Sequence, residues 1–175
     1  AKQSGDEMAQ RAIAHLQHIV RTMPGVIYHD RINQAELARE FMRAGVWAYP
    51  TWFNETSCIS AMEAQAAGCE IVTSDLAALR ETVTKDRGIL LDWDRPWEEN
   101  TTEPTKAYKE KFVTEVVRAM TKATEAERDH VRAYALEHFG LEALADEWDK
   151  MLIDLVAEVT EQVVPRFVDV EVVAA

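Results

Sequence analysis

The sequence predicts an α/β fold, a Rossmann-like parallel sheet with flanking helices, and three observations support this prediction. Four short apolar runs have the length of buried strands: Val26–Tyr28, Val46–Tyr49, Ile71–Thr73 and Gly88–Leu91. Segments with helical spacing of apolar residues separate these runs. The resulting alternation of strand and helix is typical of a parallel sheet with helices on both faces.

The expected helices have recognisable ends. The first four cover residues 5–21, 34–44, 58–67 and 76–83. Ser57 and Asp75 have side chains that can cap the third and fourth of these helices, and Gly68 ends the third. Pro24 and Gly25 stop the first.

Beyond residue 92 the sequence predicts a loop and then helices. Residues 93–105 contain two prolines and clustered charges, as surface loops do, and three helical segments follow to about Val163. We expect these helices to cover the sheet. Residues 164–175 show no clear period after Pro165, so they are expected to form a tail, and residues 1–163 a single domain.

Composition bounds the class of protein. With 175 residues, 47% of them hydrophobic and 29% charged, the chain matches one compact globular domain. No apolar stretch approaches the ~18 residues of a membrane helix, and no signal peptide is recognisable. The only cysteines, Cys58 and Cys69, are too few for a disulfide framework. These features predict a cytoplasmic protein with reduced thiols.

The net charge of −12 argues against nucleic acids and anionic membranes as partners. An anionic ligand such as a nucleotide remains compatible with this charge, because helix N-termini and a few local cations can hold a phosphate. Any phosphate site is therefore expected to be local.

Two carboxylates lie eight residues apart in the most polar loop of the chain and the helix after it. Glu55 follows a strand, and Glu63 lies between Met62 and Ala64 in an otherwise apolar helix. A buried carboxylate is costly unless something pairs with it, and a ligand hydroxyl would be such a partner. The alternative is that Glu63 lies on the exposed edge of its helix and Glu55 is solvated in its loop.

The run from Val26 to Glu81 resembles the nucleotide-binding core of family 4 of the retaining glycosyltransferases of GT-B type. Glu55 and Glu63 match the E-x7-E motif of that family. The flanking matches are Pro50-Thr51, Ala66-Ala67-Gly68, the strand Ile71–Thr73 and Leu79-Arg80-Glu81. Residues 132–152 resemble the closing helices of the family more loosely. The resemblance implies that the chain is part of the C-terminal, donor-binding half of a GT-B fold.

The resemblance also implies a reaction and its residues. Such an enzyme transfers a sugar from a UDP-, GDP- or ADP-linked donor to an acceptor hydroxyl with retention, without a metal or a cofactor. Glu55 would be the catalytic residue that faces the transferred sugar, and Glu63 would accept hydrogen bonds from the ribose hydroxyls. The remaining substrate-binding residues would be Thr56 and Ser57 beside the sugar, Cys58 and Ile59 with Ser57 at the phosphates, and His29, Arg31 and Ile32 near the nucleobase.

The chain departs from the family at several points. The family usually has glycine near Asp30 and at Thr56 and Ser57, and often proline at Glu70. It also has two further strands, with a basic pair that grips the diphosphate, before the point at which this sequence begins. We therefore expect a chain truncated at its N-terminus that is inactive without an acceptor-binding N-terminal domain. An exposed sheet edge would then favour oligomers. The alternative function is a non-catalytic binding or assembly module with this fold.

Weaker patterns point to metals or stacking. Asp92-Trp93-Asp94 has the spacing of a D-x-D metal site, and His15 with His18 could share a helix face, but such short patterns are common by chance. We predict no metal site. Trp52 or Phe53 in the loop could stack on a sugar or base.

Overall fold

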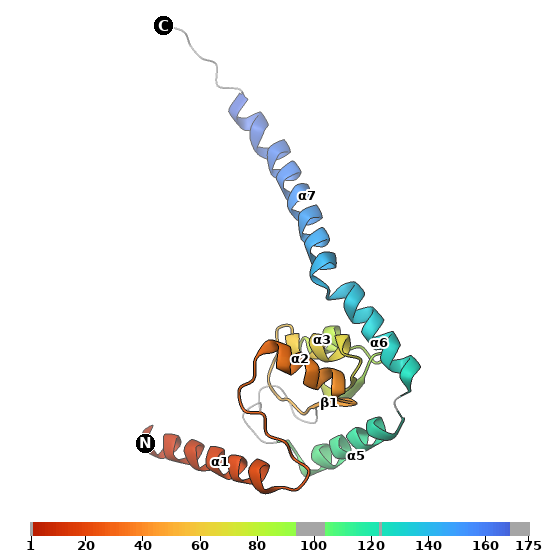
Figure 1. Ribbon diagram of the computed structural model, residues 1–175. Coiled ribbons are helices and arrows are strands. Elements are labelled where there is room, and N and C mark those ends of the chain that lie inside the picture. Colours follow the sequence, from red (N-terminus) through yellow and green to blue (C-terminus); the bar gives the residue numbers. More distant parts are fainter. Residues whose placement is uncertain (1, 94–103, 123, 169–175) are drawn as a thin grey trace. The chain divides into compact units, whose positions relative to one another are not determined.

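The computed structural model describes residues 2–93, 104–122 and 124–168. The chain divides into two compact units, residues 1–37 and 38–175. The first unit contains helix α1 (Lys2–Thr22) and the start of helix α2 (Gln34–Arg43) (Figure 1). Asn33 and Glu36 cap α2 reciprocally, because the Glu36 amide donates to Asn33 Oδ1 at 2.9 Å and the Asn33 amide to Glu36 Oε2 at 3.2 Å. Both helices lie close to their predicted ranges.

The strand expected at Val26–Tyr28 is wrong. These residues are irregular and exposed, and the Ile27 side chain is 79% exposed. A strand needs hydrogen bonds from a neighbouring strand, and no ladder in the part of the chain that the structure describes includes these residues. An apolar run of three residues cannot form a stable strand without such a neighbouring strand.

The sheet is parallel, as predicted. It consists of β1 (Val46–Tyr49), β2 (Glu70–Asp75) and β3 (Ile89–Asp92) in the order β1-β2-β3. Tyr49 is paired with Thr73, and Asp75 with Asp92. Since all three strands run in the same direction, their carboxyl ends meet at one edge, where ligands of open α/β sheets usually bind.

Helices cover the two faces of the sheet. Ile71 of β2 packs in a cluster with α3 (Ile59–Ala66) and α4 (Leu79–Thr82), whereas the next residue, Val72, packs with α5 (Lys106–Lys122). This alternation follows from the two-residue period of a strand. The α3 cluster consists of Cys58, Ala61, Ala64, Ala67, Cys69, Ile71, Leu79 and Val83, whose small residues allow α3 to lie close to the sheet.

The end of α3 is as predicted, but the starts of α3 and α4 are not. Gly68 has a φ of 75°, the Gly68 amide donates to the Gln65 carbonyl at 2.8 Å and the next amide donates to the Ala64 carbonyl at 2.9 Å, which is a Schellman motif. The expected cap Ser57 is wrong, because α3 begins one residue later with Cys58 as its N-cap. The expected cap Asp75 is also wrong, because β2 continues through this residue and α4 is a single turn.

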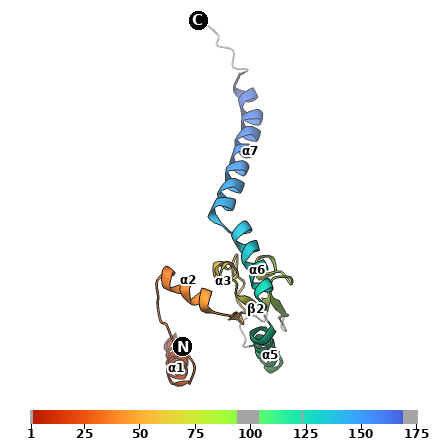
Figure 2. The same ribbon diagram turned by 45° about the vertical axis from the view of Figure 1, so that its right-hand side comes forward.

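Two further helices complete the described chain. Helix α6 (Glu125–His138) begins with a capping box at Thr124 and lies beside α3 (Figures 1 and 2). Helix α7 (Leu141–Val168) follows and contacts α6. The prediction that all three C-terminal helices cover the sheet is wrong for α7, whose side chains at residues 141–160 are mostly exposed, with Trp148 at 58%.

The predicted tail from Val164 is also wrong in part, because α7 continues to Val168, beyond Pro165. A proline removes one hydrogen bond and disfavours a helix without always ending it. Residues 169–175 lie outside the described chain.

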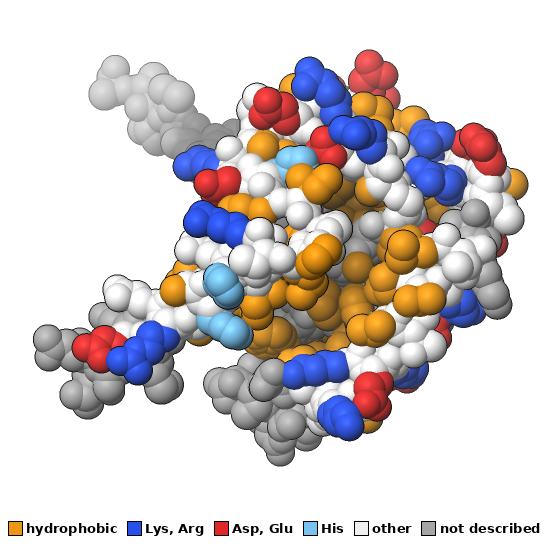
Figure 3. Space-filling model, turned by 60° about the horizontal axis from the view of Figure 1, so that its bottom comes forward, with side chains coloured by type: hydrophobic (Ala, Val, Ile, Leu, Met, Phe, Trp, Pro, Cys, Tyr) orange, Lys and Arg blue, Asp and Glu red, His pale blue; other side chains and the backbone are white. Residues whose placement is uncertain are grey.

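Exposed hydrophobic side chains are numerous in this protein. Figure 3 shows such side chains in orange, with charged side chains in blue and red. Among the described residues, no helix combines the length and the apolar character needed to cross a membrane.

Candidate active site

Glu55 lies at the carboxyl edge of the sheet, in the loop that follows β1. Its Oε1 accepts a hydrogen bond of 2.8 Å from the hydroxyl of Tyr49, the last residue of β1. The Thr51 side chain lowers the pKa of Tyr49, but burial and the Glu55 carboxylate outweigh this effect and raise the pKa. Tyr49 therefore keeps its proton and holds the partly buried Glu55 side chain in one place.

The start of this loop is anchored from the α5 face of the sheet. Thr51 is buried, and its carbonyl accepts a hydrogen bond of 2.5 Å from Ser74 Oγ in β2. Ser74 Oγ also lies 2.6 Å from the hydroxyl of Tyr108 in α5. Because Ser74 has a single proton, which it donates to Thr51, Tyr108 is the donor in the second bond.

The end of the loop is anchored by the segment around α4. The Ala78 amide donates to the Glu55 carbonyl at 3.2 Å, and Thr82 Oγ1 donates to the Ser57 carbonyl at 2.8 Å. The side chains of Thr56 and Ser57 remain exposed. The loop therefore has a fixed backbone and leaves these two residues accessible to a ligand.

Helix α3 begins directly after this loop. Its N-cap Cys58 is buried and has the left-handed φ of 57°, without a side-chain hydrogen bond to the helix. Ile59, the first helical residue, is 68% exposed. The first amides of a helix have no intrahelical acceptor and carry its positive dipole end, so this start is suited to an anion.

The structure brings part of the predicted site together. Residues 55–59 form one continuous segment, and Glu63 lies about one turn further along α3, half-buried. His29, Arg31 and Ile32 belong to the other unit, in the irregular segment before α2. Their role near a nucleobase stays a prediction.

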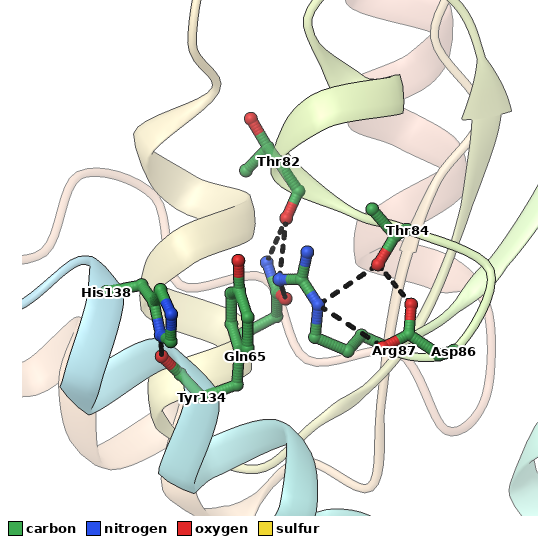
Figure 4. Close-up of polar contacts among 7 residues, drawn as sticks. All are labelled: Gln65, Thr82, Thr84, Asp86, Arg87, Tyr134 and His138. Atoms are coloured by element: carbon green, nitrogen blue, oxygen red, sulfur yellow. Dashed lines mark hydrogen bonds and ion pairs between the residues drawn. The ribbon is translucent and has the colours of Figure 1, made fainter.

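A buried polar network beneath the site was not predicted (Figure 4). Arg87, only 3% exposed, donates to Gln65 Oε1 at 2.9 Å and to the Thr82 carbonyl at 3.2 Å, and its guanidinium lies 3.6 Å from the centroid of the Tyr134 ring. Gln65 Nε2 donates to the same Thr82 carbonyl at 3.1 Å. Glu63 was the expected candidate for a buried polar residue in α3, but it is only half-buried, whereas Gln65 is fully buried.

The burial of Gln65 could have been predicted from its position in the helix. It lies four residues after Ala61 and one after Ala64, and both alanines are fully buried. Helical spacing therefore placed Gln65 on the packed face of α3. No comparable pattern marks Arg87, which lies in a polar turn before β3.

No cluster of three or more metal-ligating side chains occurs among the described residues. His15 and His18 are among the described residues, whereas Asp94 of the D-x-D pattern lies outside them.

Comparison with known proteins supports the resemblance noted in the sequence. The family described as Glycosyl transferases group 1 matches residues 4–99 of the 175, a region that contains all three strands, the loop after β1 and the α3 start. None of the curated proteins matches the chain significantly. Since the family match covers more than half of the chain, the protein belongs to the group 1 glycosyltransferases.

Proposed function

We propose that the segment Thr51–Glu63 is the donor site of a retaining glycosyltransferase, which transfers a sugar from a nucleotide-sugar to an acceptor hydroxyl. The observation that carries this proposal is the Glu55 carboxylate, which the Tyr49 hydroxyl fixes at the carboxyl edge of the sheet, in the loop that leads to the start of α3. A preorganised carboxylate at this place can face the sugar ring, since its position costs no rearrangement when the donor binds.

The donor diphosphate would bind at the start of α3. Exposed Thr56, Ser57 and Ile59 leave room for a phosphate beside the first helical amides. Segment 51–63 contains no lysine or arginine, so these amides would be the main local source of positive charge. We infer that cations from outside this segment complete the phosphate site, without a metal ion or a cofactor.

Glu63 would hold the ribose. Its carboxylate has acceptor oxygens only, which match the two hydroxyl donors of a ribose. The nucleobase, whether uracil, guanine or adenine, would lie further from the sugar, and His29, Arg31 and Ile32 are the proposed contacts. Trp52 and Phe53, exposed by 46% and 65% in the loop that carries Glu55, are further candidates for stacking on the donor.

Binding of free UDP, GDP and ADP, measured by calorimetry, tests the site. We expect one of the three to bind, and Glu63→Ala to weaken its binding by about 1–3 kcal/mol, because ribose hydroxyls lose their acceptor. Glu137→Ala on the exposed surface of α6 is the control and should bind like the wild type. If the wild type, Glu63→Ala and Glu137→Ala bound the nucleotide equally well, Glu63 would be a surface charge without a role in binding. If the wild type bound none of the three nucleotides, the alternative function, a non-catalytic binding or assembly module, would be favoured.

The chain alone should bind its donor without transferring the sugar. Charge on the leaving diphosphate needs preorganised cations, and the acceptor needs a second surface to be positioned near the sugar. We propose that an acceptor-binding N-terminal domain supplies both. Mass spectrometry of donor mixtures should detect no transfer or hydrolysis by the isolated chain, and robust turnover would refute this part of the proposal.

We also propose that the chain self-associates through the outer edge of β1. Within the described residues β1 pairs with β2 alone, and a hollow of about 420 Å³ beside it is lined by Val46, Ala48, Val116 and Met120 among others. Light scattering should detect dimers or larger species. Ala48→Lys should shift them to monomers, because a charge at an edge strand opposes pairing with another chain.

A further inference from the structure

Thr82 links the candidate loop to the buried polar network on the α3 side of the sheet. It is 5% exposed, and its hydroxyl donates to the Ser57 carbonyl at 2.8 Å. Its own carbonyl accepts from Gln65 Nε2 at 3.1 Å and from Arg87 Nη1 at 3.2 Å. A chain of hydrogen bonds therefore runs from Arg87, near the amino edge of the sheet, to the last loop residue before the α3 N-cap.

Ser57 is the point at which a shift would matter most. The next residue, Cys58, has a left-handed backbone that non-glycine residues rarely adopt, so the surrounding contacts must hold it. The bond from Thr82 restrains the peptide that joins Ser57 to Cys58. If this peptide rotates, the Cys58 amide turns with it, and the amides at the start of α3 change direction in turn.

The neighbouring backbone contact acts in the same way. The Ala78 amide, one turn before Thr82, donates to the Glu55 carbonyl at 3.2 Å. Ala77 just before it has a φ of 48°, a second left-handed non-glycine residue. The α4 segment thus holds two carbonyls of the loop, Glu55 and Ser57, and only the bond to Ser57 comes from a side chain that substitution can remove.

We infer that Thr82 is a positioning residue for the donor site, which sets the direction of the amides at the start of α3 through the Ser57 carbonyl. Gln65 and Arg87 act one step further away, because they fix the Thr82 carbonyl and so the place of its hydroxyl. This inference rests on the proposed function, since it assigns these amides a ligand. Thr82 itself touches no ligand in this scheme.

Thr82→Val tests the inference, because it keeps the shape of the side chain and removes the hydroxyl. Hydrogen exchange of the peptide covering residues 55–61 should become roughly two- to tenfold faster, the range expected for the loss of one hydrogen bond. Peptides covering β3 should exchange as in the wild type. The affinity for the nucleoside diphosphate identified by calorimetry should fall by a similar factor.

Thr82→Ser is the conservative variant. It retains the hydroxyl, so its exchange and its affinity should both equal those of the wild type. Thr114→Val, which removes an exposed hydroxyl bonded within α5, controls for the loss of a hydroxyl elsewhere. If Thr82→Val does not fold, Gln65→Met replaces it. This variant removes the Gln65 bonds to the Thr82 and Ala61 carbonyls. Exchange at residues 55–58, which precede Ala61, should therefore accelerate by a smaller factor, because the Thr82 carbonyl keeps its bond to Arg87.

Unchanged exchange at residues 55–61 in Thr82→Val, or equal acceleration in Thr82→Val and Thr82→Ser, would overturn the inference. The proposed function fails separately, if the wild-type chain binds none of UDP, GDP and ADP. In that case the exchange data alone still decide whether Thr82 holds the loop.

Discussion

Polar side chains gather at both edges of the sheet, but they are held differently at the two edges. At the carboxyl edge, Glu55 is bonded to Tyr49, and the Thr51 and Ser57 carbonyls accept hydrogen bonds from buried hydroxyls. At the amino edge, Glu70 lies half-buried beside a hollow of about 380 Å³. Burial and the nearby Glu127 raise the pKa of Glu70, and Arg118 opposes them.

This difference shows where the fold has fixed its polar groups. A ligand site needs groups that stay in place before the ligand arrives, and the carboxyl edge has them. At the amino edge, burial and the nearby Glu127 instead destabilise the ionised form of Glu70. Arg87 connects the two regions, because it lines the hollow at the amino edge and supports Thr82 beneath the loop.

The largest expected effect comes from removing this connection. Arg87→Leu leaves the buried Gln65 Oε1 without its donor and removes the cation–π contact with Tyr134, which should lower the free energy of unfolding by about 2–4 kcal/mol. Urea denaturation measures this change. Arg80→Leu is the matched control, because the Arg80 side chain is 62% exposed and its ion pair with Asp75 should contribute little. If both variants lost a similar free energy of unfolding, the Arg87 network would contribute no more to stability than the Arg80 ion pair.

A smaller effect is expected at the other anchor of the loop. Tyr108→Phe removes the hydroxyl that donates to Ser74 and should lower the free energy of unfolding by about 0.5–1.5 kcal/mol. Tyr28→Phe removes an exposed hydroxyl and is the control. Hydrogen exchange should show faster opening near Thr51 only in Tyr108→Phe. If hydrogen exchange near Thr51 were unchanged in Tyr108→Phe, the bond from Ser74 would hold this end of the loop independently of Tyr108 in α5.

Sequence patterns predicted the central fold because its signals are local. Gly68 was recognised as a helix end from its place after Ala66-Ala67, and the structure shows the left-handed conformation that glycine favours there. The three confirmed strands were marked by apolar runs between helices. Val26–Tyr28 gave the same local signal without forming a strand, since pairing depends on a neighbour that local sequence does not reveal.

The candidate site was predicted less completely, for a related reason. The Glu55 and Glu63 motif indicated one loop and the helix after it, and the structure has this loop and helix in one continuous segment. The supports of the loop, however, come from residues distant in sequence. Ser74, Thr82 and Tyr108 lie 23, 25 and 34 residues from the groups to which they are bonded. No spacing rule predicts such contacts from one sequence, because they depend on how the helices pack on the sheet.

The smallest expected effect concerns the pH dependence of stability at the amino edge. The folded chain binds the Glu70 proton more tightly than the unfolded chain, whose carboxyl has the ordinary pKa of 4.5. Below pH 4.5 the Glu70 carboxyl is protonated in both the folded and the unfolded chain, so it does not lower the free energy of unfolding. As the pH rises from there through the raised folded pKa, the unfolded state releases its proton first, and stability is lost.

Glu70→Gln never ionises and should escape this loss. Its stability relative to the wild type should therefore increase as the pH rises from 4 toward 7, as measured by urea denaturation at a series of pH values. Glu137→Gln, an exposed carboxylate on α6, is the control and should follow the wild type. If the difference between Glu70→Gln and the wild type were constant across this range, the amino edge would impose no penalty on its carboxylate. The contrast between the two edges would then rest on hydrogen bonding alone.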